Sequence, residues 1–173
     1  YYTQIQDYID AQRCFTGAGS CIAANLTRTN GYVFLKFVNQ RARLYGMDVS
    51  GHMPLARSEG YGALTATAVI SYVDGKNETT GDNLYNIMPL NARLAVSQRL
   101  AGWTNTAEIE LVDAKTQVSQ VRNELRTSGY GLLNLRTGYE WKQFRFDASL
   151  ENALDKFYNH PLGGAYTGEG ATM

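Results

Sequence analysis

Four side chains of this sequence are candidate ligands for a soft metal ion. Imidazole nitrogens and thioether sulfurs suit copper better than they suit hard cations such as Mg²⁺ or Ca²⁺. The candidates are His52, Met88, His160 and Met173. Each also has an ordinary structural explanation, as a packed or a solvated side chain. The sequence therefore supplies candidate metal ligands but no complete metal site.

Acid–base and nucleophilic chemistry has less support. The chain holds only two His residues, and neither lies near a Ser or Cys nucleophile motif. Glu108 and Glu110 are carboxylates on one face of a predicted strand, while Arg93, Arg99 and Arg136 lie on neighbouring segments. These arginines could pair with the two glutamates, or they could attract an anionic metal chelate. We expect no enzyme activity and no cofactor that folding requires.

Two cysteines, Cys14 and Cys21, lie seven positions apart in the stretch CFTGAGSC. They lack the CxxC spacing of a metal site, and no His is close in sequence to complete a zinc site. Two unrelated thiols are the alternative. We predict a local disulfide that closes a surface loop, which implies an oxidising compartment.

Composition excludes several classes of protein. The 16 basic and 16 acidic residues cancel, so no basic excess is available for a nucleic-acid partner. Twelve Tyr and 17 Gly with three Pro suit many strands joined by turns. No apolar run approaches the ~18 residues of a spanning helix. The chain opens on Tyr1-Tyr2 within a strand pattern and without a signal peptide, so we expect a cut N-terminus.

Apolar residues recur with a period of two along most of the chain, which indicates strands. Phe144, Phe146, Ala148 and Leu150, for example, alternate with charged or hydroxyl side chains. The pattern predicts seven strands, the second of which could be split by a turn near 39–41. The predicted ranges are 1–11, 32–56, 61–74, 90–101, 103–117, 130–140 and 144–157.

The connections between these strands alternate strictly between long and short. Long connections cover 12–31, 75–88, 118–129 and the segment from 161, while 57–60, 102 and 141–143 are short. Bacterial outer-membrane barrels have this asymmetry, with long loops outside and short turns in the periplasm.

A soluble β-sandwich also alternates polar and apolar residues. Three features favour a membrane barrel. Several predicted strands exceed ten residues, whereas strands of soluble proteins average about five or six. Loop lengths alternate. Aromatic residues lie near strand ends, where the headgroup zone of a bilayer favours Tyr and Trp; they are Tyr61, Tyr72, Trp103, Tyr130, Tyr139, Trp141, Phe144 and Phe157.

The bilayer would decide which face points where. An Arg turned toward lipid at mid-bilayer costs about 2–4 kcal/mol, so the charged faces, with His52, are expected to line the lumen. Met47 and Met53 are expected to face lipid or the interface. Seven strands do not close a bacterial barrel, because known single-chain barrels have an even number of eight or more. The chain is therefore predicted to be a fragment that pairs with further strands.

Several segments, read in order, resemble TonB-dependent outer-membrane receptors. The opening YYTQIQDYI is similar to a strand of that family, as are VNQRARLYGMDVSGHMPL, IMPLNARLAVSQRL and GYGLLNLRTGYEW. In the second of these, Asp48 stands where the family more often has Glu. The segment LENALDKFY is the most specific match, through Asn152, Leu154, Asp155, Lys156 and Tyr158.

The resemblance implies a barrel of roughly 22 strands, of which residues 1–173 would be a C-terminal portion without the plug, the earlier strands or the closing strand. It implies a bacterial outer-membrane location, contact with membrane lipid and lipopolysaccharide, and energy from the TonB complex acting through the plug. The tail YNHPLGGAYTGEGATM is most similar to the copper-receptor branch.

Three functions from different classes follow. The first is active uptake of a scarce metal or metal chelate, with copper as the leading ligand and a ferric siderophore or cobalamin as the alternative. The second is a passive porin, which long strands and several long loops disfavour. The third is an enzyme or adhesin barrel, of which the enzyme is disfavoured by the lack of a Ser/His pair.

Overall fold

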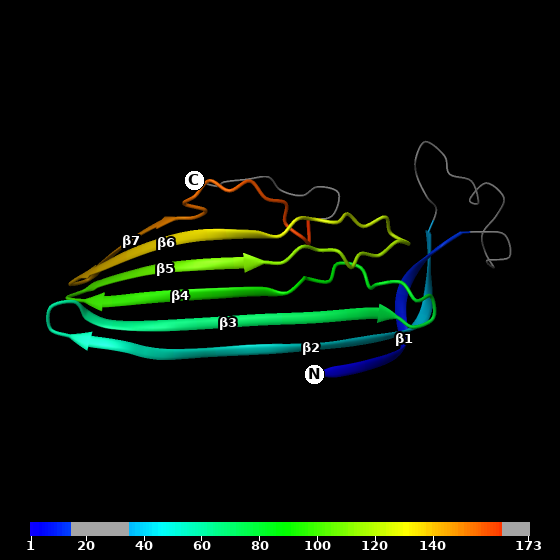
Figure 1. Ribbon diagram of the computed structural model, residues 1–173, viewed down its shortest axis with the longest axis horizontal. Coiled ribbons are helices and arrows are strands. Elements are labelled where there is room, and N and C mark those ends of the chain that lie inside the picture. The colour runs from blue at the N-terminus through cyan, green and yellow to red at the C-terminus, as the bar shows by residue number, and fades with distance from the viewer. Residues whose placement is uncertain (15–34, 164–173) are drawn as a thin grey trace.

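The computed structural model describes residues 1–14 and 35–163, which form strands joined by turns and loops (Figure 1). Seven strands make one antiparallel sheet in which sequence neighbours lie side by side. Within this described range, no helix is long and apolar enough to cross a membrane. The predicted all-β antiparallel fold is confirmed. The strands are β1 (Tyr2–Arg13), β2 (Leu35–Ser58), β3 (Gly62–Asn77), β4 (Asn91–Leu100), β5 (Trp103–Val112), β6 (Tyr130–Trp141) and β7 (Phe144–Leu150).

Short turns lie at one end of the sheet and long connections at the other (Figure 1). A two-residue turn joins β4 to β5 through Ala101 and Gly102, whose φ angles are 48° and 88°. Positive φ at both central residues is the hairpin geometry that matches the twist of the flanking strands. A Cβ atom on Gly102 would lie 2.8 Å from the carbonyl oxygen of Glu140, so glycine also fits the space. The predicted alternation of long and short connections is confirmed for the described strands.

Among the described strands, β2 is the longest and has no internal turn, so the single strand is confirmed over the alternative of a turn near residues 39–41. Its 24 residues would extend about 80 Å at 3.3–3.4 Å per residue. Its first part pairs with β1, from Leu35 opposite Arg13 to Tyr45 opposite Tyr2. Its second part pairs with β3 as far as Ser58. One strand thus joins the loop end of the sheet to the turn end.

The pairing register sorts the side chains onto two faces of different chemistry. One cross-strand row reads Met53, Ala66, Val96, Ala107, Leu135 and Leu150. The next row, on the opposite face, reads Pro54, Thr65, Ser97, Thr106, Arg136 and Ser149. We call these the apolar face and the polar face. Because opposite residues of an antiparallel pair point the same way, the sequence alternation fixes both faces at once.

The apolar face is uncovered in the described part of the chain. Phe146 is 60% exposed, Leu150 48% and Ile109 46%. Contiguous apolar surface of this kind marks a contact with membrane or with protein. The buried apolar cluster is small and lies on the other side of the sheet: Val112, Tyr130 and Leu132, with Met88 and Tyr158 packed against them. The sheet is therefore a wall rather than a domain with its own large core.

Aromatic side chains gather on the apolar face at the turn end. Trp103 and Tyr139 are opposite in the register, with ring centroids 4.6 Å apart, and Trp141 and Phe144 follow at 6.3 Å. The predicted girdle is present at these four positions. At Tyr130 the prediction was wrong, because this residue is 7% exposed and its register places it on the polar face. Phe157 was also wrong, because it lies beyond the last strand.

Two strands end earlier than the alternation predicted. Strand β5 ends at Val112 rather than 117, because the Asp113 side chain accepts a hydrogen bond from the Ala114 amide at 2.7 Å and the chain turns into its own loop. Strand β7 ends at Leu150 rather than 157, because a turn begins at Asn152. Period-two patterning continued past both points, but local side-chain bonds redirected the backbone.

Strands β1 and β7 are the edges of the sheet, each with one neighbour among the described residues. Beyond Gly46, whose backbone bonds to Tyr1, β2 likewise has a described partner only on its β3 side. Free backbone N–H and C=O groups line these edges.

Candidate functional site

The polar face carries ion pairs between neighbouring strands. Arg93 on β4 lies 3.5 Å from Glu110 on β5, and Arg136 on β6 donates to Glu108 on β5 at 3.2 Å. The amide of Asn134 also donates to Glu108 at 3.2 Å. The register places Arg93 directly opposite Glu110. Arg136 is opposite Thr106, which lies two residues before Glu108 on the same face of β5. The interpretation in which arginines pair with these glutamates is confirmed for Arg93 and Arg136.

At the turn end of the polar face the charges are less balanced. Arg145 is held by Glu140 at 3.3 Å and by Asp147 at 2.9 Å. Arg57 and Arg99 lie on either side of Ala63 in the register. Neither of these two arginines forms an ion pair with any residue in the described ranges. This end of the face could attract an anion.

Beyond the strands, three segments interlock at the loop end: residues 78–90, 113–129 and 151–163, which we call the loop collar. Its centre is the ion pair of Lys115 and Glu124, at 2.6 Å, with side chains 2% and 3% exposed. Lys115 also donates to the carbonyl of Pro161 at 3.0 Å. Glu124 accepts from the backbone amides of Asn86 and Ser119. One buried pair therefore joins all three segments.

Asp82 is a second anchor between the first two collar segments. Its carboxylate accepts from the backbone amides of Gln120 and Val121 and from the Ser119 hydroxyl, at 2.9–3.0 Å. Burial opposes ionisation of this carboxyl group, but these bonds, with one from the Asn83 amide, outweigh burial and lower the pKa of Asp82. The loops are thus held in shape by a carboxylate that stays charged.

The collar is also tied to β1, far across the sheet. The Arg13 guanidinium donates to the Val121 carbonyl at 3.1 Å and to the Asn123 side chain at 2.6 Å. Asp10, which is 6% exposed, pairs with Arg122 at 3.3 Å and accepts from the Asn77 amide at 2.9 Å. Strand β1 bends across the loop end of the sheet toward these contacts (Figure 1). The loop collar and the end of β1 therefore form one connected structure in the described part of the chain.

A turn at Asn152 brings the chain after β7 back over the polar face. Asn152 has φ of 50°, its side chain bonds both the amide and the carbonyl of Lys156, and its amide donates to the Asn134 side chain at 2.9 Å. Tyr158 then packs on Tyr130 with ring centroids 4.4 Å apart. The segment LENALDKFY is thus an anchored turn instead of the end of a strand.

The predicted metal ligands do not converge in the described structure. His52 is exposed on the polar face, opposite Thr67, as expected for a lumen-facing residue. Met88 packs against the cluster of Val112, Tyr130 and Leu132, which is the structural role that the sequence left open for it. Met173 lies outside the described residues. Among the described residues, no group of three His, Cys, Asp or Glu side chains could hold a metal ion.

His160 is exposed. It lies two residues after Tyr158, which packs against the same buried cluster as Met88. Its Nδ1 accepts a hydrogen bond from the Leu162 amide at 3.2 Å. A neutral imidazole with an accepting Nδ1 carries its proton on Nε2. Binding of a metal ion by either nitrogen would therefore need this local hydrogen bond or tautomer to change.

Cys14 is disulfide-bonded. Its predicted partner, Cys21, lies outside the described residues, so the Cys14–Cys21 pairing stays a prediction.

The sequence reasoning missed the residues that build the collar. Lys115, Glu124 and Asp82 lie in segments predicted only as long polar loops, and their partners are distant in the sequence. The excess of Asn, Asp, Gly and Thr in 75–88 was the available signal, since such residues cap turns with their side chains.

Comparison with known proteins adds two findings. The family model described as "TonB dependent receptor-like, beta-barrel" matches residues 1–153. A solved structure described as "Copper transporter OprC" is similar in fold, with a TM-score of 0.73 and 19% sequence identity. The similarity covers 93% of this chain but 23% of that structure, so the chain spans about a quarter of its length. No curated protein sequence matches significantly. The family match ends next to Asn152, where the chain leaves the sheet.

Proposed function

Because the chain belongs to the TonB dependent receptor-like β-barrel family, we propose that it forms part of the barrel wall of an outer-membrane active transporter. In this role its apolar face contacts lipid and its polar face lines the lumen. Further strands of the same receptor pair with the free edges of β1 and β7, because an open sheet edge in hydrocarbon is costly. Residues 1–173 are then a C-terminal portion of one barrel domain.

The observation that carries this proposal is the two-faced sheet with all its short turns at one end. A bilayer stabilises the arrangement in which the apolar side chains, such as Phe146 and Leu150, face lipid. The charged side chains, such as Arg136 and Glu108, then face away from it. In this orientation the turn end with Trp103 and Trp141 faces the periplasm, and the loop collar faces outward. Outer-leaflet lipopolysaccharide and membrane lipid are then the partners of the apolar face.

The wall and the collar suit a receptor rather than a passive pore. A passive pore needs an open lumen, whereas here an ordered collar is braced by a buried ion pair and by a segment that turns back over the polar face. Uptake through such a receptor draws energy from the TonB complex through a plug domain. No enzyme chemistry is assigned to the chain.

Copper is the leading transported ligand. It is supported by the fold likeness to a structure described as a copper transporter and by the soft donors His52, Met88, His160 and Met173. The three donors among the described residues, His52, Met88 and His160, are not assembled into a site, so binding would draw on further groups of the receptor. More broadly, the transported ligand is a metal ion or a metal chelate. Arg57 and Arg99 would favour an anionic chelate.

The test is metal content of the complete receptor, purified in detergent and incubated separately with Cu(I), Cu(II), ferric siderophores and cobalamin. Near one equivalent of copper after gel filtration, reduced in a variant that carries His52→Ala and His160→Ala, supports the proposal. A receptor that binds a ferric siderophore or cobalamin and no copper would refute the copper assignment. Conductance in planar bilayers without any energy source would instead support a passive porin.

A further inference from the structure

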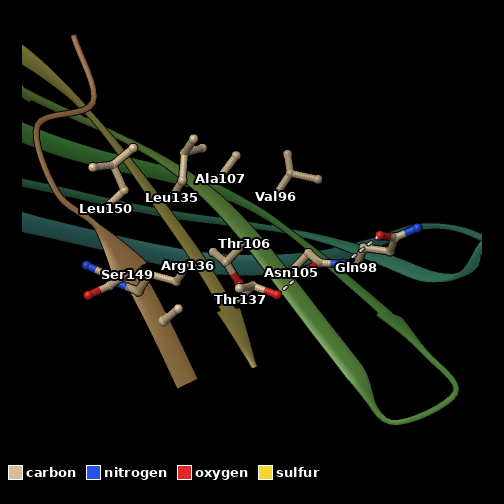
Figure 2. A pocket seen from close by; sticks show the side chains of 11 residues that line it. Val96, Gln98, Asn105, Thr106, Ala107, Leu135, Arg136, Thr137, Ser149 and Leu150 are labelled. Atoms are coloured by element: carbon tan, nitrogen blue, oxygen red, sulfur yellow. Dashed lines mark hydrogen bonds between the residues drawn. The ribbon is translucent and has the colours of Figure 1, made fainter. Parts of the chain in front are cut away.

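The apolar face carries a short row of polar side chains close to the turn end. Gln98, Asn105 and Thr137 are opposite one another on β4, β5 and β6. The Thr137 hydroxyl donates to the side-chain oxygen of Asn105 at 2.7 Å, and the side-chain amide of Asn105 donates to the side-chain oxygen of Gln98 at 3.2 Å (Figure 2). The Gln98 amide then donates to the backbone carbonyl of Tyr61 at 3.0 Å. We call this row the amide ladder.

The amide ladder leaves two hydrogen-bond donors unused. A primary amide has two N–H groups, and both Asn105 and Gln98 spend one of theirs within the ladder. The second N–H of each has no partner among the described residues. Inside a membrane, an N–H group without a hydrogen-bond acceptor is costly. Two such groups on a face that contacts lipid therefore indicate a partner that supplies the acceptors.

Beside the ladder, the apolar face is hollowed into a groove. Its lining includes Val96, Ala107, Leu135 and Leu150, with the ladder residues at one end (Figure 2). Ala148 also lines it, as do Thr106, Arg136 and Ser149 of the polar face. The small side chains Ala107 and Ala148 lie among larger neighbours, which makes the hollow. The groove therefore offers an apolar channel that ends at two free N–H donors.

The depth of the ladder identifies the chemical group that would meet it. Trp103 and Tyr139 form the next row toward the turns, where aromatic rings mark the headgroup level. The ladder lies two residues further along each strand, which is about 7 Å along the strand and about 5 Å in depth at a tilt near 45°. Ester carbonyls of a glycerophospholipid lie just below its headgroup, and they are acceptors without donors of their own.

We propose that this groove is a specific binding site for one glycerophospholipid of the periplasmic leaflet. The ester carbonyls accept hydrogen bonds from Asn105 and Gln98, and an acyl chain lies in the groove along Ala107, Leu135 and Leu150. This inference rests on the proposed function, which sets the apolar face against lipid and the short turns in the periplasm. A lipopolysaccharide is the wrong occupant, because it belongs to the opposite leaflet.

The experiment is native mass spectrometry of the complete receptor in a detergent that strips loosely held lipid, followed by lipid identification. The double variant Gln98→Leu and Asn105→Leu removes the donors but keeps an apolar surface. The variant Ala107→Phe fills the groove. Ala92→Phe, on the apolar face toward the loop end and outside this groove, is the matched control.

We expect one phospholipid on the parent and on Ala92→Phe, and about tenfold weaker retention, equal to about 1.4 kcal/mol, in the other two variants. Equal retention in all four proteins, a lipopolysaccharide in place of the phospholipid, or a bare parent protein would each overturn the site. Heat-dependent gel migration and membrane fractionation of the same samples separate the two proposals. A receptor that is a folded outer-membrane barrel without bound phospholipid refutes only this inference, whereas one that is absent from the outer membrane refutes the proposed function.

Discussion

The polar face of the wall and the loop collar both contain pairs of opposite charge, but the pairs are exposed in the wall and buried in the collar. In the wall, Arg93 and Glu110 are 3.5 Å apart with side chains 62% and 19% exposed. In the collar, Lys115 and Glu124 are 2.6 Å apart and 2% and 3% exposed. Exposed pairs contribute about 0–1 kcal/mol because water screens them. Breaking a buried pair by removing one partner costs about 3–5 kcal/mol, because it leaves an uncompensated charge.

This difference separates two tasks within one chain. The wall keeps its charges hydrated and available, as a surface that meets solvent or a passing ligand requires. The collar keeps its charges dry and fully bonded, which holds three loop segments in one arrangement. Long loops without secondary structure are usually mobile, so bonds of this density indicate a defined shape at the loop end.

The largest effect is expected from Glu124→Gln in the complete receptor. It leaves the ammonium group of Lys115 buried without a carboxylate, at a cost of about 3–5 kcal/mol to the collar. Hydrogen exchange of residues 113–129 should become much faster, while strands β3 to β6 keep their protection. Arg93→Gln in the wall is the control and should leave exchange in both regions unchanged. Equal protection of 113–129 in the parent and in Glu124→Gln would contradict the comparison.

A smaller effect is expected at the turn where the wall passes into the collar. Asn152 has a φ of 50°, a left-handed conformation that Asn tolerates through local side-chain hydrogen bonds. Alanine lacks these bonds, so in Asn152→Ala this conformation costs about 1–2 kcal/mol. The substitution also removes both side-chain bonds to Lys156. Exchange of the amides of residues 153–163 should speed up, and the Tyr158–Tyr130 contact should loosen.

Asn152→Gly separates these two contributions, because glycine tolerates the positive φ but lacks the side chain. We expect it to lie between the parent and Asn152→Ala. If Asn152→Gly is as unstable as Asn152→Ala, the side-chain bonds to Lys156 carry the whole effect. If both variants match the parent, the anchored turn contributes nothing to the collar.

Acid should loosen the collar at Asp82. The pKa of Asp82 is lowered in the folded protein, so its contribution is complete above the ordinary value of 3.8 and is lost as the pH falls below it through the folded pKa. Proteolysis of 113–129 at a series of pH values should therefore increase below about pH 4. Asp82→Asn should be more susceptible at neutral pH and show less change with acid. A pH response that Asp82→Asn leaves intact would assign it to another group.

The wall was predictable from the sequence and the collar was not, for a physical reason. Alternation is local, so Thr106 and Ala107 reveal their faces without knowledge of their partners, and the turn at Gly102 sets the register of β4 against β5. The pairing of Glu108 and Glu110 with nearby arginines followed from this register. Local patterning is enough wherever neighbours in space are neighbours in the sheet.

The collar depends on contacts that no local pattern encodes. Arg13 bonds Asn123 across 110 positions of sequence, and Lys115 meets Pro161 across 46. Side-chain bonds at Asn152 also stopped a strand whose alternation ran on to Phe157. The same reasoning placed Tyr130 in the aromatic girdle, although loop residues cover it on the polar face.

The smallest effect is expected for the wall pair itself. A double-mutant cycle of Arg93→Gln and Glu110→Gln should give a coupling below about 1 kcal/mol that shrinks further with added salt. Such a value means that the polar face stays hydrated in the complete receptor, as a lumen surface open to a ligand would be. A coupling of several kcal/mol that salt does not change would mean that other parts of the receptor cover this face. The wall would then be a packed interface like the collar, and the ligand would have to pass elsewhere.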